Sequence, residues 1–241
     1  MKILILGGIA EAVLLAKQLC ATQHSIVYSL VGLGRQPELN CPIQSGVFSN
    51  SQALTHFLID GQFDLLIDCT HPYAANISQY ACHASQQSNV TLWTYRRPAW
   101  QARPSDHWQL TENWSATLPL LRPYYRPLLT IGRLPIHDLA QIQPHQTWFI
   151  RCLAQANLPS HPNVHWLLTR GPFQLDAEIA LMKQQQFDVL VCKNSGGHAV
   201  HNKLVAAQQL NIPVLMLARP SLPECNHSFD DIQMLLGALS L

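Results

Sequence analysis

Short apolar runs rich in Leu, Ile and Val alternate along the chain with longer stretches of helical periodicity. Residues 3–6 form one such run before Gly7, and residues 63–70 lead through a helix of about four turns to another run at 90–95. Continuous apolar runs of this length, each followed by a helix, predict buried parallel strands joined by crossover helices. We therefore expect an α/β fold with parallel sheets.

The pattern is repeated in the second half of the chain. Phe63 has its counterpart at Phe187, 124 residues later, and Pro98 has its counterpart at Pro220, 122 residues later. Upstream, residues 3–7 correspond to residues 128–132 at an offset of 125. We predict two Rossmann-like lobes, 1–122 and 123–241, arranged as an internal repeat around a cleft. Their boundary falls in the stretch 119–127, which is rich in Pro, Arg and Tyr.

Composition excludes several classes of protein. The chain has 241 residues, 48% of them hydrophobic and only 12% charged, which is typical of a folded domain and not of a disordered one. A net charge of +1 without a basic run argues against nucleic acid as a partner. No apolar window is long enough to predict a membrane span. We expect a protein of the cytoplasm.

Cysteine and histidine spacing gives no support for a metal site. The seven cysteines include no C-x-x-C pair, and the twelve histidines include no H-E-x-x-H motif. An odd number of cysteines without such spacing is typical of reduced thiols. We therefore predict that the protein holds no metal.

The first glycine pair is a candidate phosphate-binding turn. Gly7 and Gly8 follow a predicted strand and precede a predicted helix, whose first N–H groups are suited to a diphosphate. The full G-x-G-x-x-G fingerprint is absent, and a generic strand-to-helix turn would use glycine equally well. The second strand ends in the loop 29–35 without an acidic residue for a ribose diol, and Arg35 there suits a 2′-phosphate. A solvated loop arginine is the alternative.

Two further loops carry candidate chemistry. Residues 70–74 read Thr-His-Pro-Tyr-Ala, and a capped helix with Pro72 at its first position would explain them structurally. His71 in such a loop is also suited to proton transfer near neutral pH. Residues 193–197 read Lys-Asn-Ser-Gly-Gly, where a lysine directly after a buried strand favours an anionic partner.

Five arginines are candidates for binding an acidic ligand: Arg96, Arg97, Arg133, Arg151 and Arg170. If several of them share one site, they indicate a ligand with many carboxylates or phosphates. The alternative is that they form scattered surface ion pairs.

These segments, in this order and spacing, resemble the family of precorrin-6A and cobalt-precorrin-6A reductases. The resemblance covers essentially the whole chain and is carried by the Gly-Gly turn with Glu11 and by residues 70–74, 97–100, 170–173, 193–197 and 213–220. It implies an oxidoreductase of cobalamin biosynthesis that reduces a ring double bond of an acidic tetrapyrrole, giving precorrin-6B or its cobalt counterpart. The resemblance implies a nicotinamide dinucleotide as the cofactor, and Arg35 favours NADPH, with NADH as the alternative.

The resemblance also implies a division of labour between the lobes. The first lobe is expected to bind the cofactor through Gly7, Gly8, Ile9, Ser29, Arg35, Gly46, Phe48, Thr70 and Pro72, with His71 as proton donor or orienting group. The substrate is expected to contact Arg96, Arg97, Arg170, Lys193, Asn194, Ser195, Gly196 and Gly197. Transient contact with neighbouring enzymes of the pathway is expected besides the small-molecule substrate.

The chain departs from the family pattern at two places. Ile9 and Val13 replace a threonine and an arginine that family members usually have, and the glycine-rich segment after the second strand keeps only Gly46 and Phe48. A non-catalytic tetrapyrrole carrier derived from such a reductase is therefore one alternative function. A two-lobed enzyme acting on a nucleotide sugar or phosphometabolite is another, because fold alone does not define chemistry.

Overall fold

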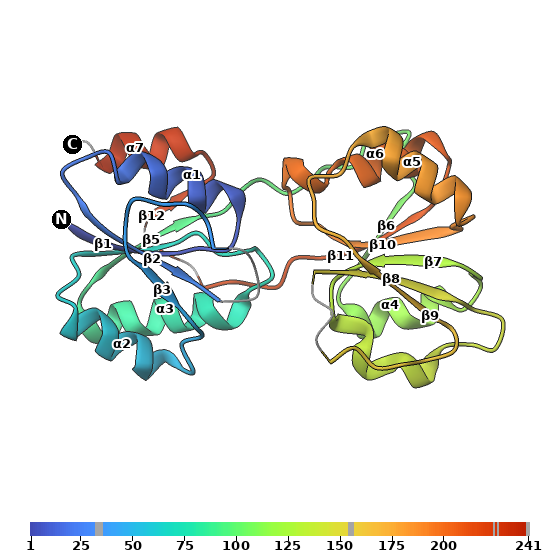
Figure 1. Ribbon diagram of the computed structural model, residues 1–241, viewed down its shortest axis with the longest axis horizontal. Helices are drawn as coiled ribbons and strands as arrows, with labels where there is room; N and C mark the ends of the chain where they lie inside the picture. The colour runs from blue at the N-terminus through green and yellow to red at the C-terminus, as the bar shows by residue number, and fades with distance from the viewer. Residues whose placement is uncertain (32–35, 154–156, 224, 226, 240–241) are drawn as a thin grey trace. The chain divides into compact units, whose positions relative to one another are not determined.

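The computed structural model describes residues 1–31, 36–153, 157–223, 225 and 227–239, and it divides into two compact units (Figure 1). Unit 1 comprises Met1–Pro98 and Pro220–Leu241, and unit 2 comprises Ala99–Arg219. Each unit is a parallel six-stranded sheet with helices on both faces. The predicted α/β class with two parallel sheets is confirmed.

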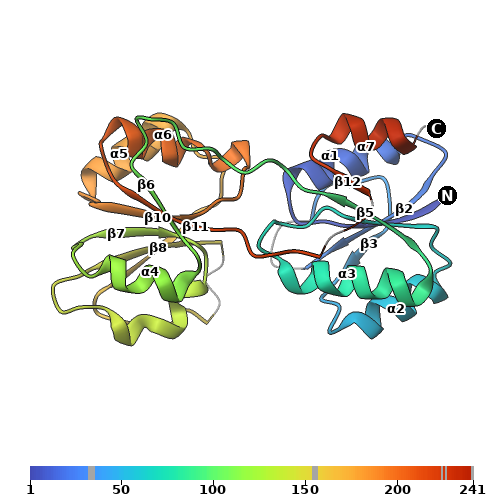
Figure 2. The ribbon, with the colours of Figure 1, turned by 180° about the vertical axis from the view of Figure 1, so that it is seen from behind.

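The sheet of unit 1 has the order β12-β5-β4-β1-β2-β3, which is the doubly wound order of a Rossmann fold. Its strands are β1 (Lys2–Leu6), β2 (Ser25–Leu30), β3 (Ile43–Ser45), β4 (Leu65–Asp68), β5 (Thr91–Tyr95) and β12 (His227–Phe229). Alternate residues of β1 point to opposite faces, so that Ile3 and Ile5 enter one apolar core while Leu4 and Leu6 enter another. Helices α1 (Ala10–Leu19) and α7 (Ile232–Leu239) cover the first core, and α2 (Ser51–Asp60) and α3 (Ala75–Ser88) cover the second (Figure 2).

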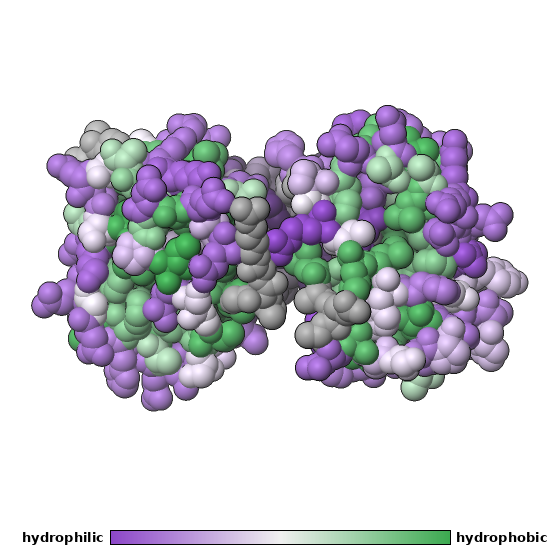
Figure 3. Space-filling model, in the orientation of Figure 1, coloured by the Kyte–Doolittle hydropathy of each residue, from purple (hydrophilic) through white to green (hydrophobic). Residues whose placement is uncertain are grey.

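The sheet of unit 2 has the corresponding order β6-β11-β10-β7-β8-β9. Its strands are β6 (Trp108–Thr111), β7 (Pro127–Thr130), β8 (Trp148–Cys152), β9 (Val164–Leu168), β10 (Val189–Lys193) and β11 (Val214–Leu217). The helical segments are α4 (Trp114–Leu121), the 3₁₀ segment η1 (Leu134–Gln141), α5 (Leu175–Gln184), the 3₁₀ turn η2 (His198–Val200) and α6 (Asn202–Gln209). On the face shown in Figure 3, hydrophilic side chains are spread over the outer surface of both units.

The sixth strand of each sheet comes from the other half of the repeat. After β5 of unit 1 the chain forms β6, which pairs with β11 of unit 2, and after β11 it forms β12, which pairs with β5. The predicted boundary between residues 122 and 123 therefore differs from the observed division at 98/99 and 219/220. The stretch 119–127 is not a linker, because it holds the end of α4 with Pro119 inside the helix and the start of β7.

The internal repeat extends to the backbone conformation. Gln62 and Gln186 have φ of 51° and 50°, and Asn89 and Asn211 have φ of 57° and 53°. These pairs lie 124 and 122 residues apart, as the sequence repeat predicts. Strand register corrects one offset: Leu4 pairs with Leu66 and Leu128 with Leu190, so β1 and β7 are also related by 124 residues and Gly8, not Gly7, corresponds to Gly132.

Two findings bear on the sequence-based expectations about a membrane span and a metal site. No described helix is both long and apolar enough to cross a membrane. The described residues contain no group of three or more His, Cys, Asp or Glu side chains arranged to hold a metal ion.

Candidate functional site

The loops after β1 and β4 lie side by side where these two central strands of the unit 1 sheet end, along the carboxyl edge of the sheet. The amide of Cys69 donates to the Leu6 carbonyl at 2.9 Å, and the amide of Gly7 donates to the Ser29 carbonyl of β2 at 2.9 Å. Strand order reverses between β1 and β4, and open α/β sheets bind ligands at such a switch point. This edge is therefore the candidate site of unit 1.

Glycine is required at both positions of the first loop, but for different structural reasons. A Cβ on Gly7 would lie 2.1 Å from the ring of Tyr28, whereas a Cβ on Gly8 would meet no atom of the described residues within 4 Å. Gly7 is thus required for packing, and Gly8 for its φ of 136°, which side chains rarely adopt. Burial raises the pKa of Tyr28 to about 12, so the ring beneath Gly7 stays neutral. The open side of the turn is at Gly8.

Helix α1 begins directly after this turn. Ile9 precedes it in extended conformation, and its side chain does not cap the first N–H groups. Glu11 in the first turn would repel an anion there, but Arg97 lies 3.2 and 3.3 Å from its two carboxylate oxygens. The charge of Glu11 is thus compensated, and the helix start retains donors suited to phosphate oxygens.

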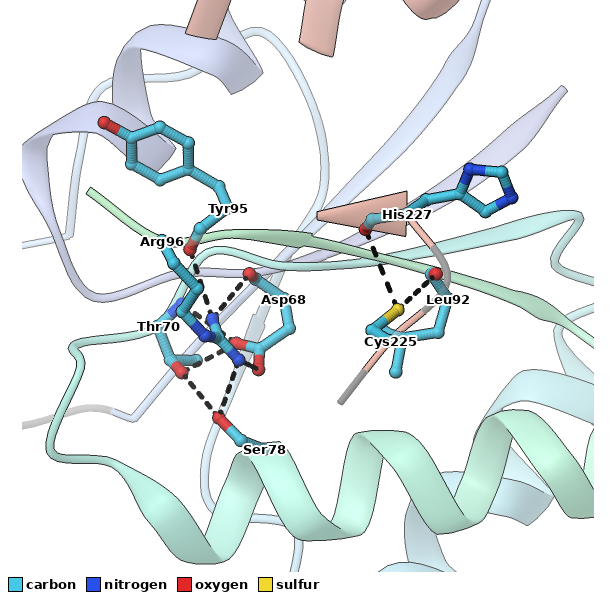
Figure 4. Close-up of polar contacts among 8 residues, drawn as sticks. All are labelled: Asp68, Thr70, Ser78, Leu92, Tyr95, Arg96, Cys225 and His227. Atoms are coloured by element: carbon cyan, nitrogen blue, oxygen red, sulfur yellow. Dashed lines mark hydrogen bonds and ion pairs between the residues drawn. The ribbon is translucent and has the colours of Figure 1, made fainter. Parts of the chain in front are cut away.

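A buried ion pair organises the end of β4 (Figure 4). The Asp68 carboxylate, which is fully buried, accepts hydrogen bonds from the Thr70 amide at 3.0 Å and the Thr70 hydroxyl at 2.7 Å, and it pairs with Arg96. Arg96 also donates to the Ser78 hydroxyl of α3 at 3.1 Å. Burial by itself would raise the pKa of Asp68, but the Arg96 charge and these hydrogen bonds hold it below its usual value.

The loop 70–74 differs from the predicted helix start. Helix α3 begins at Ala75 with Ala74 before it, so Pro72 is not its first residue and Thr70 does not cap it. The Thr70 hydroxyl is instead turned to Asp68, because the buried carboxylate needs donors. The His71 ring is half-buried, and its Nδ1 accepts the Tyr73 amide at 3.2 Å. Neutral His71 therefore carries its proton on Nε2.

The remaining predicted cofactor residues lie at the ends of β2 and β3. Ser29 is buried, and Gly46 has a φ of 121° with its amide bonded to the Leu30 carbonyl at 3.1 Å. The Phe48 side chain packs against Phe57, with 5.4 Å between ring centroids, so it serves the core under α2. Arg35 lies outside the described residues.

In unit 2 the segment 193–197 begins with the last residue of β10. Burial lowers the pKa of Lys193, which is half-buried at the strand end. The Asn194 side chain accepts the Trp100 amide at 2.8 Å and donates to the Trp100 carbonyl at 3.1 Å, so it fixes the chain that leads into β6. Ser195 is buried, Gly196 has a φ of 71°, and Gly197 precedes η2.

The arginines that the sequence singled out are divided between the two units. Arg96 and Arg97 are paired with Asp68 and Glu11 inside unit 1. In unit 2, Arg151 is buried against Glu178 and Arg170 is exposed. Sequence reasoning overlooked Asp68 and Ser78 as partners, since each stands in an ordinary strand or helix position. Their contacts with Arg96 join residues 28 and 18 positions apart, which no local pattern reveals.

Fold and site together define a protein of two Rossmann-like units whose first unit carries an open glycine turn at the switch point. The chain belongs to the precorrin-6x reductase family, CbiJ/CobK, which matches residues 2–240. The predicted family is thereby confirmed.

Named relatives support the same assignment. The chain is 38% identical to the precorrin-6A reductase of Rhodococcus erythropolis, over 96% of this chain and 94% of that protein, and 34% identical to that of Sinorhizobium sp, over 96% and 92%. A solved structure of CobK precorrin-6A reductase matches with a TM-score of 0.91 and 29% identity, over 100% of this chain and 96% of the other. The protein is a reductase of cobalamin biosynthesis.

Proposed function

We propose that the chain reduces one ring double bond of precorrin-6A to give precorrin-6B, with NADPH as the hydride donor. The relatives at 38% and 34% identity carry the name precorrin-6A reductase, which favours the metal-free substrate over its cobalt counterpart. The observation that carries the cofactor assignment is the open Gly8 turn before the uncapped start of α1. Backbone donors in that position are suited to a diphosphate.

The residues around the turn fit a dinucleotide. Glu11, the acidic residue of the first helical turn, is compensated by Arg97, and no atom of the described residues lies within 4 Å of a Cβ placed on Gly8. Arg35 would bind the 2′-phosphate that distinguishes NADPH from NADH. When bound, the cofactor supplies the hydride, while the protein supplies orientation and charge.

The loop 70–72 supplies the proton in this scheme. Hydride addition to one atom of the substrate double bond leaves the other atom to receive a proton. His71 carries its proton on Nε2, because Nδ1 accepts the Tyr73 amide. Asp68 acts as a positioning residue, since it accepts two hydrogen bonds from Thr70, the residue before His71. Arg96 supports it by pairing with the Asp68 carboxylate.

The carboxylates of the substrate are assigned to unit 2. Lys193 and the backbone of residues 194–197 would bind them, with the exposed Arg170 as a further cation. Arg96 and Arg97 are left out of this set, because each already compensates a carboxylate of unit 1.

The decisive experiment follows the macrocycle absorption spectrum while NADPH is consumed. We expect wild-type protein to convert precorrin-6A with one NADPH oxidised per ring reduced, and to act more slowly on cobalt-precorrin-6A. The faster conversion of the cobalt form would reverse the substrate assignment. A carrier protein would bind the tetrapyrrole without saturable NADPH binding, which cofactor fluorescence measures.

The NADPH preference is tested at Arg35. Replacing Arg35 by Ala should weaken NADPH binding by about 1.5–3 kcal/mol, the value of a charge-assisted contact, and leave NADH almost unchanged. Calorimetric titration with both cofactors gives the comparison. An equal loss for both would remove Arg35 from the 2′-phosphate site.

A further inference from the structure

Two cysteines of unit 1, Cys20 and Cys41, lie against the same apolar core. Cys20 directly follows helix α1, and its amide donates to the Ala16 carbonyl at 2.9 Å, so the backbone there is still held by the helix. Both cysteines are half-buried and pack against the core cluster that α1 and α7 cover. Since neither residue is fully buried, a small molecule from solvent can approach this part of the core.

Cys41 reaches this face of the sheet from the segment before β3. The Tyr28 amide of β2 donates to the Pro42 carbonyl at 2.9 Å, which keeps this segment beside β2. Tyr28 is paired in register with Ile43, and its ring belongs to the core under α1. Alternate residues of an extended chain point to the same face, and Cys41, which precedes Ile43 by two positions, packs against that core. The two cysteines therefore approach one another from separate elements.

The two thiols are in contact with each other. Cys41 and Cys20 share a side-chain hydrogen bond. Burial, followed by this hydrogen bond and the charge of a Cys20 thiolate, raises the pKa of Cys41 to about 12. Cys41 therefore keeps its proton and donates the hydrogen bond to the Cys20 sulfur, which leaves Cys20 as the nucleophile of the pair.

The other five cysteines have different surroundings. Three of them are buried: Cys69, Cys152 and Cys192. The Cys225 sulfur donates to the Leu92 carbonyl at 2.9 Å, and the Cys82 sulfur of α3 accepts the Gln86 side chain at 3.8 Å. Cys20 and Cys41 thus combine partial exposure with direct contact between two thiols.

We propose that Cys20 and Cys41 form a redox-active thiol pair, which a peroxide oxidises to a reversible disulfide. The Cys20 thiolate attacks one oxygen of the peroxide, which forms an S–O bond, breaks the O–O bond and releases hydroxide. The Cys41 sulfur then attacks the Cys20 sulfur, which forms the S–S bond and breaks the S–O bond. Each departing hydroxide takes up one thiol proton. Two thiols and one hydrogen peroxide thus give one disulfide and two waters, as two electrons pass from sulfur to oxygen.

The contact between the thiols favours closure of the disulfide after the first step. Once Cys20 is a neutral sulfenic acid, its charge no longer raises the pKa of Cys41. The two sulfur atoms are already neighbours, so the second attack is intramolecular. The bond joins the end of α1 to a residue 21 positions later in the chain and restricts the unfolded state more than the folded one. Oxidation therefore stabilises unit 1, and it does so whether or not the proposed reductase function holds.

The test treats the full, reduced chain with hydrogen peroxide and compares it with Cys20→Ser, Cys41→Ser and the control Cys82→Ser. Cys82 is a partly exposed cysteine of α3 in the same unit. For each protein we would measure the intact mass, the free thiols after denaturation, the disulfide-linked peptides and the Tm, before and after reduction with dithiothreitol. Parallel samples receive dimedone, which labels sulfenic acids.

We expect the wild-type protein to lose two hydrogen atoms and two of its seven thiols, and to give one peptide pair that links Cys20 to Cys41. The Tm of the oxidised protein should be higher by at least about 4 °C, and dithiothreitol should restore both thiols. Cys82→Ser should give the same linked pair. Cys41→Ser should accumulate a dimedone label on Cys20, and Cys20→Ser should give no linked pair.

Three results for the wild-type protein would overturn the proposal: all seven thiols stay reduced, a different pair of cysteines becomes linked, or dithiothreitol does not reverse the oxidation. An unchanged or lowered Tm would also overturn it, because the bond would then strain the native fold. The thiol count and the peptide map of the wild-type protein decide the question even if a serine variant does not fold.

Discussion

In unit 1 the buried ion pair joins the ends of two neighbouring strands, Asp68 of β4 and Arg96 after β5, whereas in unit 2 it joins strand β8 to helix α5 through Arg151 and Glu178. The repeat offsets place Cys192 and Ala218 at the unit 2 counterparts of Asp68 and Arg96. They place Ser29 and Leu54 at the unit 1 counterparts of Arg151 and Glu178. Each pair is therefore dispensable for the shared fold.

The difference teaches that the strand order and the buried charges have separate causes. The sheets form because apolar runs pair in the same order twice. Replacing a buried ion pair by well-packed apolar residues is often neutral, so charges that persist in one unit alone are better explained by a local task. In unit 1 that task is to hold Thr70, the residue before His71.

The largest effect is expected from breaking either pair. Asp68→Asn and Glu178→Gln should each lower the free energy of unfolding by about 3–5 kcal/mol, because each leaves a buried guanidinium uncompensated. The Glu178 variant should lose more, since the Arg151 side chain is 7% exposed and the Arg96 side chain 18%. Urea denaturation measures both.

A double variant sharpens this comparison. Arg151→Ser combined with Glu178→Leu installs the unit 1 residues in unit 2 and should recover most of the stability lost in Glu178→Gln. If the double variant is as unstable as the single one, the two units are not interchangeable at these positions and the repeat argument fails.

Lys193 tests the division of labour between the units. Lys193→Ala should weaken the substrate interaction by about 1.5–3 kcal/mol, seen as a lower kcat/KM, while NADPH affinity stays close to wild type. Calorimetric NADPH titration beside steady-state kinetics gives both values, with Lys183→Ala as the matched control. A large loss of cofactor affinity would move Lys193 into the cofactor site.

Gly7 tests the packing of the unit 1 turn. Gly7→Ala should cost about 1–3 kcal/mol of stability, because its Cβ would overlap the buried Tyr28 ring. Gly237→Ala in α7 is the control: a Cβ there meets no atom of the described residues within 4 Å, and alanine should stabilise the helix by about 0.5–1 kcal/mol. Thermal unfolding compares them. Equal effects would contradict the packing argument.

The smallest expected effect is a change of stability with pH that follows from ionisation of Asp68. Its folded-state pKa lies below the ordinary value of an aspartate, so its contribution to stability is complete above the unfolded-state pKa and is lost as pH falls through the folded-state value. Between about pH 5 and 8 the stability gap between wild type and Asp68→Asn should stay constant. Below about pH 4 it should narrow, which acid denaturation curves measure. A stability difference between the two proteins that widens in acid would contradict the lowered pKa of Asp68.

The sequence by itself determined the repeat, the strands and the loops that carry the candidate site. Apolar runs at 3–6 and 65–67 are local signals, and they become β1 and β4 in adjacent positions of one sheet. Gly8, His71 and Lys193 were also accessible to sequence reasoning, because glycine turns and polar residues after buried strands are local features.

Only the tertiary structure decided which half each sixth strand joins and which charges pair. β6 and β12 are short, and neither signals that it will pair with a strand more than 100 residues away. The partners Asp68–Arg96 and Arg151–Glu178 are 28 and 27 residues apart and meet only once the sheet and helices are assembled. Local patterns fix which elements form, whereas long-range pairing fixes which side chains share a low-dielectric interior, where charge carries the greatest energetic weight.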